Sequence, residues 1–322
     1  MPLSVSSRTE ALEDSARQEF AADVRAGLSR TQKELHSKYL YDELGTSLFE
    51  AITHLPEYGL TRADSRLLAA HAEEIASFAP GPLAIAELGS GTGQKSRIIL
   101  SAAPQRPRYF PIDVSYDALS ACRIELAGIA DTTPIHASYL VGLNRVAATR
   151  SDETLLVLFL GSTIGNFERP CAAEFLRSVR ERLRPGDGFL LGADLVKPVQ
   201  QLVTAYDDPA GVTAAFNRNL LGRINRELGG EFDLRAFEHE ARYNEGERRI
   251  EMHLRSRVDQ VVAIPAANHI ARFRAGETIW TESSHKFHLT DLDDMAHKAG
   301  FRLHAAWVDK EWPFAETLWI AA

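Results

Sequence analysis

Short apolar runs alternate with helical segments through the middle of the chain. The apolar runs predict strands at 82–88, 108–114, 134–140, 155–160 and 189–193, and helical spacing predicts helices at 63–78, 96–102, 116–129 and 168–183. Several of these runs are apolar at consecutive positions, which is typical of strands buried on both faces. The pattern predicts an α/β fold with a doubly wound, mostly parallel sheet that carries helices on both faces.

The segments on either side of this region follow a different pattern. Residues 1–78 are mostly helical in character, and 200–228 is a second long helical stretch. Residues 237–257 predict a β-hairpin that turns at 244–247, because residues 250–254 alternate between apolar and polar. Strand-like runs follow at 261–264 and 279–287, then a helix at 291–298 and strands at 303–308 and 317–320.

This change of pattern predicts two lobes. We expect residues 61–195 and 287–322 to form the doubly wound core, which an insertion after the fifth strand interrupts. Residues 1–60 and 196–286 are expected to form a second lobe over the ligand crevice.

The composition excludes several classes of protein. The 322 residues include 45% hydrophobic and 25% charged residues, and the net charge of −8 argues against a dedicated nucleic-acid binder. No apolar run approaches the roughly 20 residues that cross a bilayer, and residues 1–18 have no apolar segment typical of a signal peptide. With only two cysteines, a disulfide framework is not expected. We expect a cytoplasmic protein without a nucleic-acid or membrane partner.

A glycine-rich loop follows the first strand of the core. It contains Gly89, Gly91 and Gly93, whose lack of a side chain lets the backbone approach a ligand closely. Gln94 stands where a dinucleotide-binding fingerprint needs a further glycine, which disfavours a nicotinamide oxidoreductase. The pattern E-x-G-x-G-x-G is instead one associated with methyltransferases. Asp113 ends the next strand and is placed to accept hydrogen bonds from two ribose hydroxyls. The alternatives are a tight turn without a ligand and a helix-capping aspartate.

More specific motifs recur in one order over residues 35–320. They are Tyr-Asp-Glu-Leu-Gly-Thr-Ser-Leu-Phe at 41–49, Leu-Pro-Glu-Tyr at 55–58, Thr-Arg-Ala at 61–63, Glu-Leu-Gly-Ser-Gly-Thr at 87–92, Phe-Leu-Gly-Ser-Thr-Ile-Gly-Asn at 159–166, Tyr-Asp-Asp at 206–208, Gly-Val-Thr-Ala-Ala-Phe-Asn at 211–217 and Thr-Glu-Ser-Ser at 281–284. In these motifs the chain resembles the histidine Nα-methyltransferase family of ergothioneine biosynthesis.

The resemblance implies both a fold and a reaction. The fold is a class I methyltransferase, with a Rossmann-like doubly wound sheet and a second, substrate-binding lobe. The reaction is the transfer of three methyl groups, one at a time, from S-adenosylmethionine to the α-nitrogen of free histidine. It yields the trimethylated betaine hercynine as the first step of ergothioneine biosynthesis. The resemblance also implies a monomeric enzyme whose partner is a small amino-acid substrate.

The resemblance also assigns residues to the site. Those assigned to the cofactor are Gly89, Ser90, Gly91, Lys95, Asp113, Ser138 and Tyr139. Those assigned to the amino acid are Tyr58, Asn166, Tyr206, Thr213, Glu282 and Ser284, and those assigned as catalytic, close to the same site, are Tyr41, Gly161 and Thr163. We also expect the apolar Met252 near this pocket. Two positions depart from the family. Ser138 replaces an aspartate that reads the adenine, and Gly59 replaces a second tyrosine and is expected to widen the substrate entrance.

The chemistry of these side chains fits the assignment. Glu282 and Ser284 are two apart on a strand and so share a face, where a carboxylate and a hydroxyl suit the two nitrogens of an imidazole. Asn166 and Tyr206 offer neutral donors to a substrate carboxylate, and Lys95 offers a cation to the methionine carboxylate of the cofactor. The alternatives are an exposed strand glutamate, a turn asparagine, a helix-face tyrosine and a solvated lysine.

The reaction requires an amine without its proton, and no residue is an obvious general base. The Gly161 carbonyl or the Thr163 hydroxyl can orient the amine, but neither is basic enough to deprotonate an ammonium. Eleven histidines occur without an H-x-x-x-H or C-x-x-C pair, so no metal is expected.

The residues by themselves are also compatible with two other functions. One is Nα-methylation of another amino acid such as tryptophan or tyrosine, which would not use Glu282 as an imidazole acceptor. The other is a catalytically silent relative that binds the cofactor as a sensor or partner module.

Overall fold

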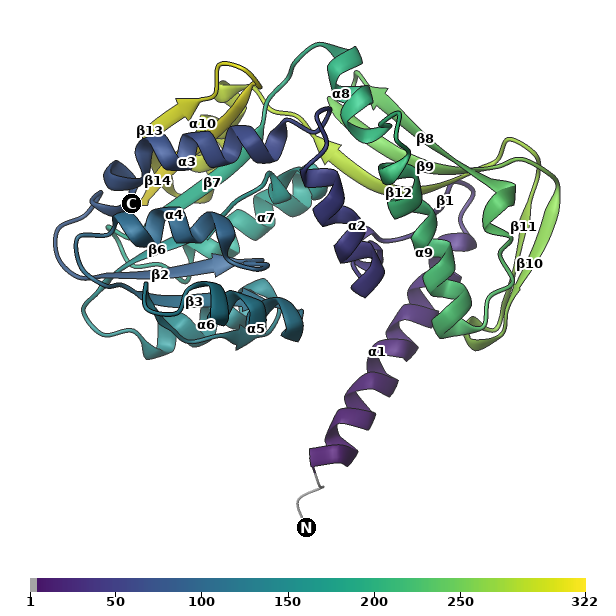
Figure 1. Cartoon of the computed structure of the whole chain (residues 1–322), viewed down its shortest axis with the longest axis horizontal. Helices are drawn as coiled ribbons and strands as arrows, with labels where there is room; N and C mark the ends of the chain where they lie inside the picture. The colour runs from purple at the N-terminus through teal and green to yellow at the C-terminus, as the bar shows by residue number, and fades with distance from the viewer. Residues whose placement is uncertain (1–4) are drawn as a thin grey trace. The chain divides into compact units, whose positions relative to one another are not determined.

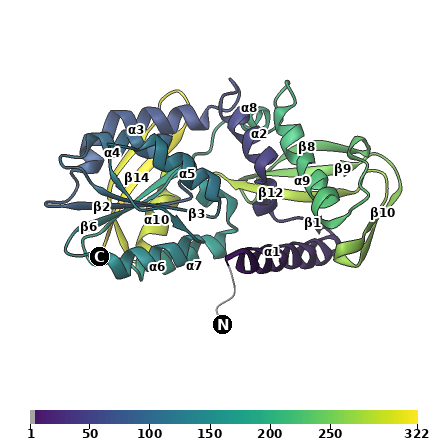
Figure 2. The same cartoon turned by 60° about the horizontal axis from the view of Figure 1, so that its bottom comes forward.

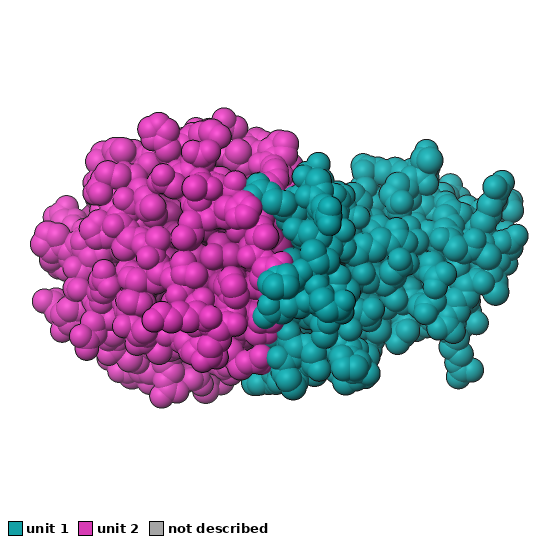
Figure 3. Space-filling view, turned by 90° about the horizontal axis from the view of Figure 1, so that it is seen from above, with its two compact units in different colours: residues 1–58, 198–284 teal, residues 59–197, 285–322 magenta. Residues whose placement is uncertain are grey.

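The computed structural model describes residues 5–322, and for residues 5–13 it describes the backbone alone. The chain divides into two compact units, coloured separately in Figure 3. Unit 1 is Met1–Tyr58 with Pro198–Ser284, and unit 2 is Gly59–Lys197 with His285–Ala322. Each unit therefore contains two separate stretches of the sequence.

Unit 2 is built on an eight-stranded sheet (Figure 1). Its strands follow the order β13-β14-β7-β6-β2-β3-β4, and β5 also pairs with β3. Strands β7, β6, β2 and β3 are neighbours that pair in parallel. Strand β14 is antiparallel to both β7 and β13. The bounds are β2 Leu83–Leu88, β3 Arg108–Asp113, β4 Asp131–Thr132, β5 Ile135–His136, β6 Thr154–Phe159, β7 Gly188–Asp194, β13 Phe301–Val308 and β14 Phe314–Ala321. The doubly wound sheet predicted from the sequence is confirmed.

Helices cover both faces of this sheet (Figure 2). One face carries α3 (Leu60–Ala76), α4 (Gln94–Ala102) and α5 (Tyr116–Glu125), and the other carries α6 (Tyr139–Thr149), α7 (Arg169–Arg180) and α10 (Leu289–Ala299). Consecutive residues of one strand supply the two cores, since Ala84 packs with α6 and α7 while Ile85 packs with α3 and α4. Burial on both faces explains why the central strands are continuously apolar.

The strand order reverses beside β2. This strand pairs with β3 on one side and with β6 on the other, and both neighbours run parallel to it. The loops that leave β2 and β6 therefore emerge side by side at the carboxyl edge of the sheet. Ligands of open α/β sheets bind at such a reversal.

Unit 1 contains a four-stranded sheet in the order β1-β12-β9-β8 and a separate β10-β11 hairpin. The predicted hairpin at 237–257 is confirmed, because β8 and β9 are antiparallel. The strands are β1 Lys33–Glu34, β8 Phe237–Asn244, β9 Arg249–Ser256, β10 Gln260–Ile264, β11 His269–Phe273 and β12 Thr278–His285. The helices are α1 Val5–Leu28, α2 Glu43–Thr53, α8 Val199–Tyr206 and α9 Val212–Leu228, with short 3-10 turns at Ser37–Leu40, Leu234–Ala236 and Pro265–Ala267.

Two predicted elements are wrong in the structure. The expected strand at 134–140 shrinks to β5, and α6 begins at Tyr139, where the apolar positions Leu143 and Val146 turn inward with helical spacing. The expected helix at 200–228 is two helices. Gly211 adopts a φ of 76°, and both carboxylate oxygens of Asp208 accept backbone N–H groups of the first turn of α9. These caps start a new helix rather than continue the old one.

Among residues 5–322, none of the helices combines the length and apolar character needed to cross a membrane.

Candidate functional site

The glycine loop after β2 needs its glycines for two reasons. Gly89, Gly91 and Gly93 have φ values of 78°, 51° and 80°, in the left-handed region that side chains rarely adopt. A Cβ on Gly93 would also lie 2.7 Å from the Cys122 sulfur. The loop is thus a tight strand-to-helix turn, and its glycines leave the backbone uncovered by side chains. Helix α4 starts directly after it.

Asp113 ties this loop to the end of β3. Its Oδ2 accepts the Gly91 N–H at 3.1 Å, and its Oδ1 accepts the Ser115 N–H at 2.9 Å. The N-cap of α5 is Ser115, whose hydroxyl accepts the Ala118 N–H at 3.2 Å, so Asp113 is not the capping residue. Each carboxylate oxygen has a second lone pair, so the half-buried Asp113 retains capacity for further donors.

Tyr139 lies against the same loop. A Cβ on Gly89 would lie 3.2 Å from the Tyr139 hydroxyl, which places the phenol beside the first glycine. Burial, with a further contribution from the Asp113 carboxylate, raises the pKa of Tyr139 to about 12, so the hydroxyl remains a donor. Ser138 precedes it at the N-cap position of α6 and is exposed. Gly89, Gly91, Asp113 and Tyr139 are therefore brought together at one edge of the sheet.

Glu87, the acid of the glycine motif, lies beneath the loop rather than in it. It is buried and accepts hydrogen bonds from the hydroxyls of Ser96 on α4 and Tyr109 on β3. Burial raises the pKa of Glu87 to about 7, against the two hydrogen bonds, which lower it. The carboxyl group joins β2, β3 and α4 and thereby supports the loop.

The loop after β6 has an unusual backbone. Gly161 and Ser162 have φ values of 71° and 60°, and a left-handed non-glycine residue costs about 1–2 kcal/mol. The Ser162 hydroxyl accepts the Asp194 N–H at 2.9 Å, and the Thr163 hydroxyl donates to the Leu160 carbonyl at 3.0 Å. A 3-10 turn, Thr163–Asn166, follows, so the half-buried Asn166 lies at the carboxyl edge of the sheet.

Lys95 connects the two loops through a buried acid that the sequence did not indicate. Its ammonium lies 2.5 Å from Asp64 Oδ2, and the same oxygen accepts the Gly161 N–H at 3.1 Å. The alternative of a solvated lysine is therefore wrong, although the Lys95 side chain keeps 25% of its surface exposed. A second buried acid, Glu316, lies beside this group.

In unit 1 an aromatic cluster collects three of the predicted site residues. Tyr41 packs on Phe49 and Phe216 with ring centroids 5.4 Å and 5.5 Å apart. Phe49 then contacts Tyr58 at 6.4 Å, and Tyr58 contacts Tyr206 at 6.0 Å, both edge to face. The resemblance had not assigned Phe49 and Phe216, although both lie within its motifs.

Tyr206 is fixed from both ends. Its hydroxyl lies 2.7 Å from the Ser284 hydroxyl on β12, and its carbonyl lies 2.7 Å from His239 Nε2. Burial lowers the pKa of His239, outweighing the hydrogen bond to Tyr206 that raises it, so the ring is neutral near pH 7. The Asn217 amide contacts the other His239 nitrogen at 2.9 Å. The structure thus brings Tyr58, Tyr206 and Ser284 together.

Glu282 lies on the opposite face of β12 from Thr281. The Thr281 hydroxyl is 2.7 Å from Asn217 Oδ1 on α9, and side chains alternate along a strand. Glu282 therefore shares its face with Trp280, whose indole N–H donates to the backbone carbonyl of Glu282 at 3.0 Å. The Arg249 guanidinium covers the Trp280 ring at 4.4 Å.

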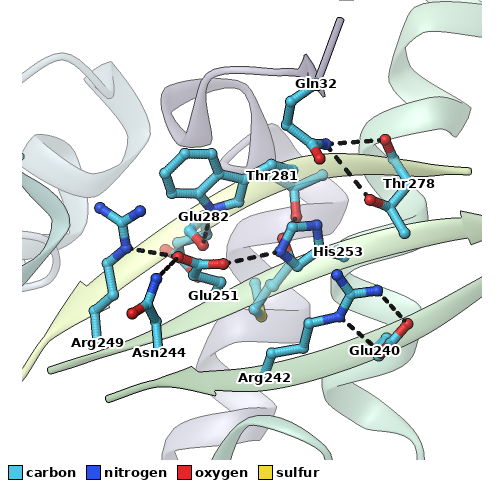
Figure 4. Close-up of polar contacts among 12 residues, drawn as sticks. Gln32, Glu240, Arg242, Asn244, Arg249, Glu251, His253, Thr278, Thr281 and Glu282 are labelled. Atoms are coloured by element: carbon cyan, nitrogen blue, oxygen red, sulfur yellow. Dashed lines mark hydrogen bonds and ion pairs between the residues drawn. The ribbon is translucent and has the colours of Figure 1, made fainter. Parts of the chain in front are cut away.

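A polar group on β9 adjoins this strand. Glu251 accepts from Arg249 at 2.8 Å and from Asn244 at 3.0 Å, and it lies 3.3 Å from His253 Nε2 (Figure 4). Burial opposes the ionisation of Glu251, but these partners outweigh it and lower its pKa. The group holds the β9 side chains in place beside Trp280.

The remaining predicted positions are buried. Met252 is 1% exposed, and its carbonyl lies 3.0 Å from the Thr281 hydroxyl. Thr213 is 2% exposed in the first turn of α9. Gly59 requires a correction. A Cβ there would lie 2.3 Å from the Trp312 ring, so the glycine makes room for this indole and does not widen a substrate entrance.

No group of three or more His, Cys, Asp and Glu side chains that could hold a metal ion occurs among the described residues.

Comparison with known proteins gives four findings that agree with one another. A family model described as "Histidine-specific methyltransferase, SAM-dependent" matches residues 20–321. A histidine N-alpha-methyltransferase of Mycolicibacterium smegmatis is 43% identical over 312 residues, covering 95% of this chain and 96% of the relative. A protein of the same name from Mycobacterium tuberculosis is 41% identical over 318 residues, with the same coverage. Ergothioneine biosynthesis protein 1 of Neurospora crassa is 34% identical over 203 residues, which cover 61% of this chain and 23% of that protein.

Proposed function

Because this chain belongs to the family of histidine-specific, S-adenosylmethionine-dependent methyltransferases, we propose that it methylates the α-amino nitrogen of free histidine. The observation that carries the proposal is the family match over residues 20–321, which spans both units. The nearly full-length similarity to two histidine N-alpha-methyltransferases supports the same substrate.

The residues of unit 2 fit the methyl donor. Three left-handed glycines leave the loop after β2 open to a ligand, and Asp113 at the next strand end can accept ribose hydroxyls. Tyr139 and Ser138 would lie at the adenine, and Lys95 would hold the methionine carboxylate beside Ser90. When bound, S-adenosylmethionine supplies a methyl group on a positively charged sulfur that leaves as a neutral thioether. No metal is needed for such a displacement.

The residues of unit 1 fit the amino acid. Tyr206 and Ser284 are hydrogen-bonded partners, and Tyr58 lies beside them. In the proposal, Tyr206 together with Asn166 of unit 2 binds the substrate carboxylate, because neutral donors avoid the cost of desolvating a protein charge. Glu282 accepts an imidazole N–H and Ser284 serves the other ring nitrogen. Met252 and Thr213 complete the side-chain site.

The reacting amine is assigned to the loop after β6. The Gly161 carbonyl can accept an amine N–H. In the proposal, the Thr163 hydroxyl and Tyr41 also lie beside the reacting amine. This arrangement aligns the nitrogen lone pair with the methyl carbon, which is the main contribution that a protein makes to such a transfer. The new N–C bond forms as the C–S bond breaks, and each transfer releases one proton from the amine.

We assign the lobes accordingly. Residues 61–195 and 287–322 are the donor-binding core, and residues 1–60 and 196–286 are the substrate-binding lobe.

We further propose that the protein is a cytoplasmic monomer that carries out three successive transfers. These transfers yield hercynine for ergothioneine biosynthesis. The name of the Neurospora crassa relative supports the pathway, and the two free cysteines fit a reducing compartment.

The experiment is a reaction with histidine and S-adenosylmethionine carrying a 13C methyl group. Nuclear magnetic resonance of the product should place the label on the α-nitrogen, first once and finally three times. A label on an imidazole nitrogen would refute the assigned position, and transfer that stops after one methyl would refute the three-step proposal.

A further inference from the structure

Two buried carboxyl groups lie behind the loop that follows β6. Asp64 on α3 and Glu316 on β14 are both 0% exposed. Asp64 Oδ2 accepts the Lys95 ammonium at 2.5 Å and the Gly161 N–H at 3.1 Å. Within the described chain, no N–H or O–H group donates a hydrogen bond to Asp64 Oδ1 or to either carboxyl oxygen of Glu316. Buried oxygens without a donor are costly, so this group requires an explanation.

Gly192 makes room for the second carboxyl. β14 and β7 are antiparallel with Glu316 opposite Gly192, and a Cβ on Gly192 would lie 2.6 Å from Glu316 Oε1. The same Cβ would lie 3.3 Å from the Gly161 nitrogen. Glu316 therefore occupies the space next to the amide that Asp64 binds.

A single proton satisfies the pair. Two buried carboxylates facing one ammonium would leave an uncompensated charge. Burial raises the pKa of Glu316 well above its usual range, and the Asp64 carboxylate raises it further. A protonated Glu316 donates a hydrogen bond, and Asp64 Oδ1 is an acceptor that otherwise lacks a donor. The group is then neutral overall, with Asp64 ionised against Lys95.

This arrangement leaves Lys95 able to bind a ligand. An ammonium has three N–H donors, and the contact with Asp64 uses one of them. The Lys95 side chain remains 25% exposed, so part of it reaches the surface of unit 2 while its end is held. Gly161, whose carbonyl is assigned to the reacting amine, is fixed through its N–H to the same Asp64 oxygen.

We propose that Asp64 is a positioning residue for the methyl donor, with Glu316 as its proton-bearing partner. Together they hold the Lys95 ammonium and the Gly161 loop where the amino-acid end of S-adenosylmethionine binds. This inference rests on the proposed function for the identity of the donor. It adds two residues that do not touch the ligand and act through Lys95 and Gly161.

Calorimetric binding of S-adenosylhomocysteine tests the role of Asp64. Asp64→Asn should weaken binding by about tenfold or more, because Lys95 loses its charged partner. Asp187→Asn is the matched control, since Asp187 is also buried and paired with a cation, Arg150 at 2.6 Å, but precedes β7 at the opposite edge of the sheet. The control should lower thermal stability and leave the affinity unchanged.

A double-mutant cycle separates positioning from general damage. If Asp64 acts through Lys95, Asp64→Asn combined with Lys95→Met should bind no more weakly than Lys95→Met alone. Fully additive losses, or an Asp64→Asn protein that binds as the parent does, would overturn the proposal.

Glu316 provides a second test that does not depend on the Asp64 variant folding. Glu316→Gln keeps a neutral donor for Asp64 Oδ1 and should bind S-adenosylhomocysteine like the parent. Glu316→Leu has no donor and should bind severalfold more weakly. An infrared difference spectrum of parent minus Glu316→Gln at neutral pH should contain the carbonyl band of a protonated carboxyl. Absence of that band, or equal binding by the glutamine and leucine variants, would refute the partner role.

The outcome is distinguishable from failure of the proposed function. A parent that binds S-adenosylhomocysteine but does not methylate histidine would refute the substrate and leave this test intact. A parent that does not bind it would overturn both proposals.

Discussion

The two units build their parts of the site from different chemistry. In unit 2 the backbone and paired charges dominate: left-handed glycines shape the loop after β2, Asp113 binds it, and Lys95 is held by Asp64. In unit 1 the predicted residues other than Glu282 are aromatic or uncharged, and the hydrogen-bonded pair of Tyr206 and Ser284 lies beside Tyr58. Glu282 is the one carboxylate assigned to the amino acid. In our proposal, unit 2 binds the methyl donor, and the unit 1 residues select the side chain of the amino acid.

The largest effect is expected in unit 2. Asp113→Ala removes the acceptor proposed for two ribose hydroxyls and releases the Gly91 N–H. Hydrogen bonds to a charged group contribute about 1.5–3 kcal/mol each, so calorimetric affinity for S-adenosylhomocysteine should fall by two or more orders of magnitude. The exposed Asp117, on the first turn of α5, provides the control as Asp117→Ala. Equal affinity of the two variants would remove the ribose assignment.

The next effect concerns the choice of amino acid in unit 1. Glu282→Ala should lower the ratio of kcat/KM for histidine over tryptophan by about 10- to 100-fold, mainly through a higher KM for histidine. The half-buried carboxylate is expected to reject a side chain that offers it no suitable donor, and the variant lacks that penalty. The control is Glu245→Ala in the exposed turn between β8 and β9. An unchanged ratio would mean that Glu282 does not contact the substrate side chain.

A smaller effect is expected from Tyr206→Phe. The change removes the hydroxyl that contacts Ser284 at 2.7 Å and keeps the ring packed on Tyr58. The proposed hydrogen bond to the substrate carboxylate should contribute about 1.5 kcal/mol, the lower end of the range for a charged partner, so KM for histidine should rise roughly tenfold. Affinity for S-adenosylhomocysteine should stay the same, because that site is assigned to unit 2. A variant that loses donor affinity but keeps KM would reverse the comparison.

The smallest effect is a pH dependence of stability in unit 2. Burial raises the pKa of Glu87 to about 7 from an ordinary 4.5. Between these values the folded chain binds more protons at Glu87 than the unfolded chain does, so the contribution of Glu87 to stability falls as the pH rises. Glu87→Gln keeps an acceptor for Ser96 and Tyr109 but cannot titrate. Denaturant unfolding of both proteins should show that the stability of the parent relative to the variant declines from about pH 4.5 to 7. A constant difference over this range would show that Glu87 titrates normally.

The sequence predicted local features well. Continuous apolar runs identified the central strands β2, β3, β6 and β7 of unit 2, because these strands are buried on both faces. The positions of Gly89, Gly91 and Asp113 followed from the general placement of ligands at the carboxyl ends of parallel strands, and the structure brings them together.

Features that depend on distant packing were missed. The contact between Asp64 and Gly161 joins residues 97 positions apart, and no spacing rule links α3 to the loop after β6. The indole of Trp312 beside Gly59 is similarly non-local, so a glycine that makes room for packing was interpreted as an opening for substrate. The break between α8 and α9 was missed because helical periodicity hid the Asp208 cap and Gly211.

A competition among substrates tests most directly whether this protein methylates histidine. The parent protein is incubated with S-adenosylmethionine and an equimolar mixture of the twenty amino acids, and the products are followed by mass spectrometry. We expect mono-, di- and trimethylated histidine, with the trimethylated form accumulating at the end. Methylation of tryptophan or tyrosine in preference to histidine, or no methylated amino acid from a protein that binds the donor, would contradict it.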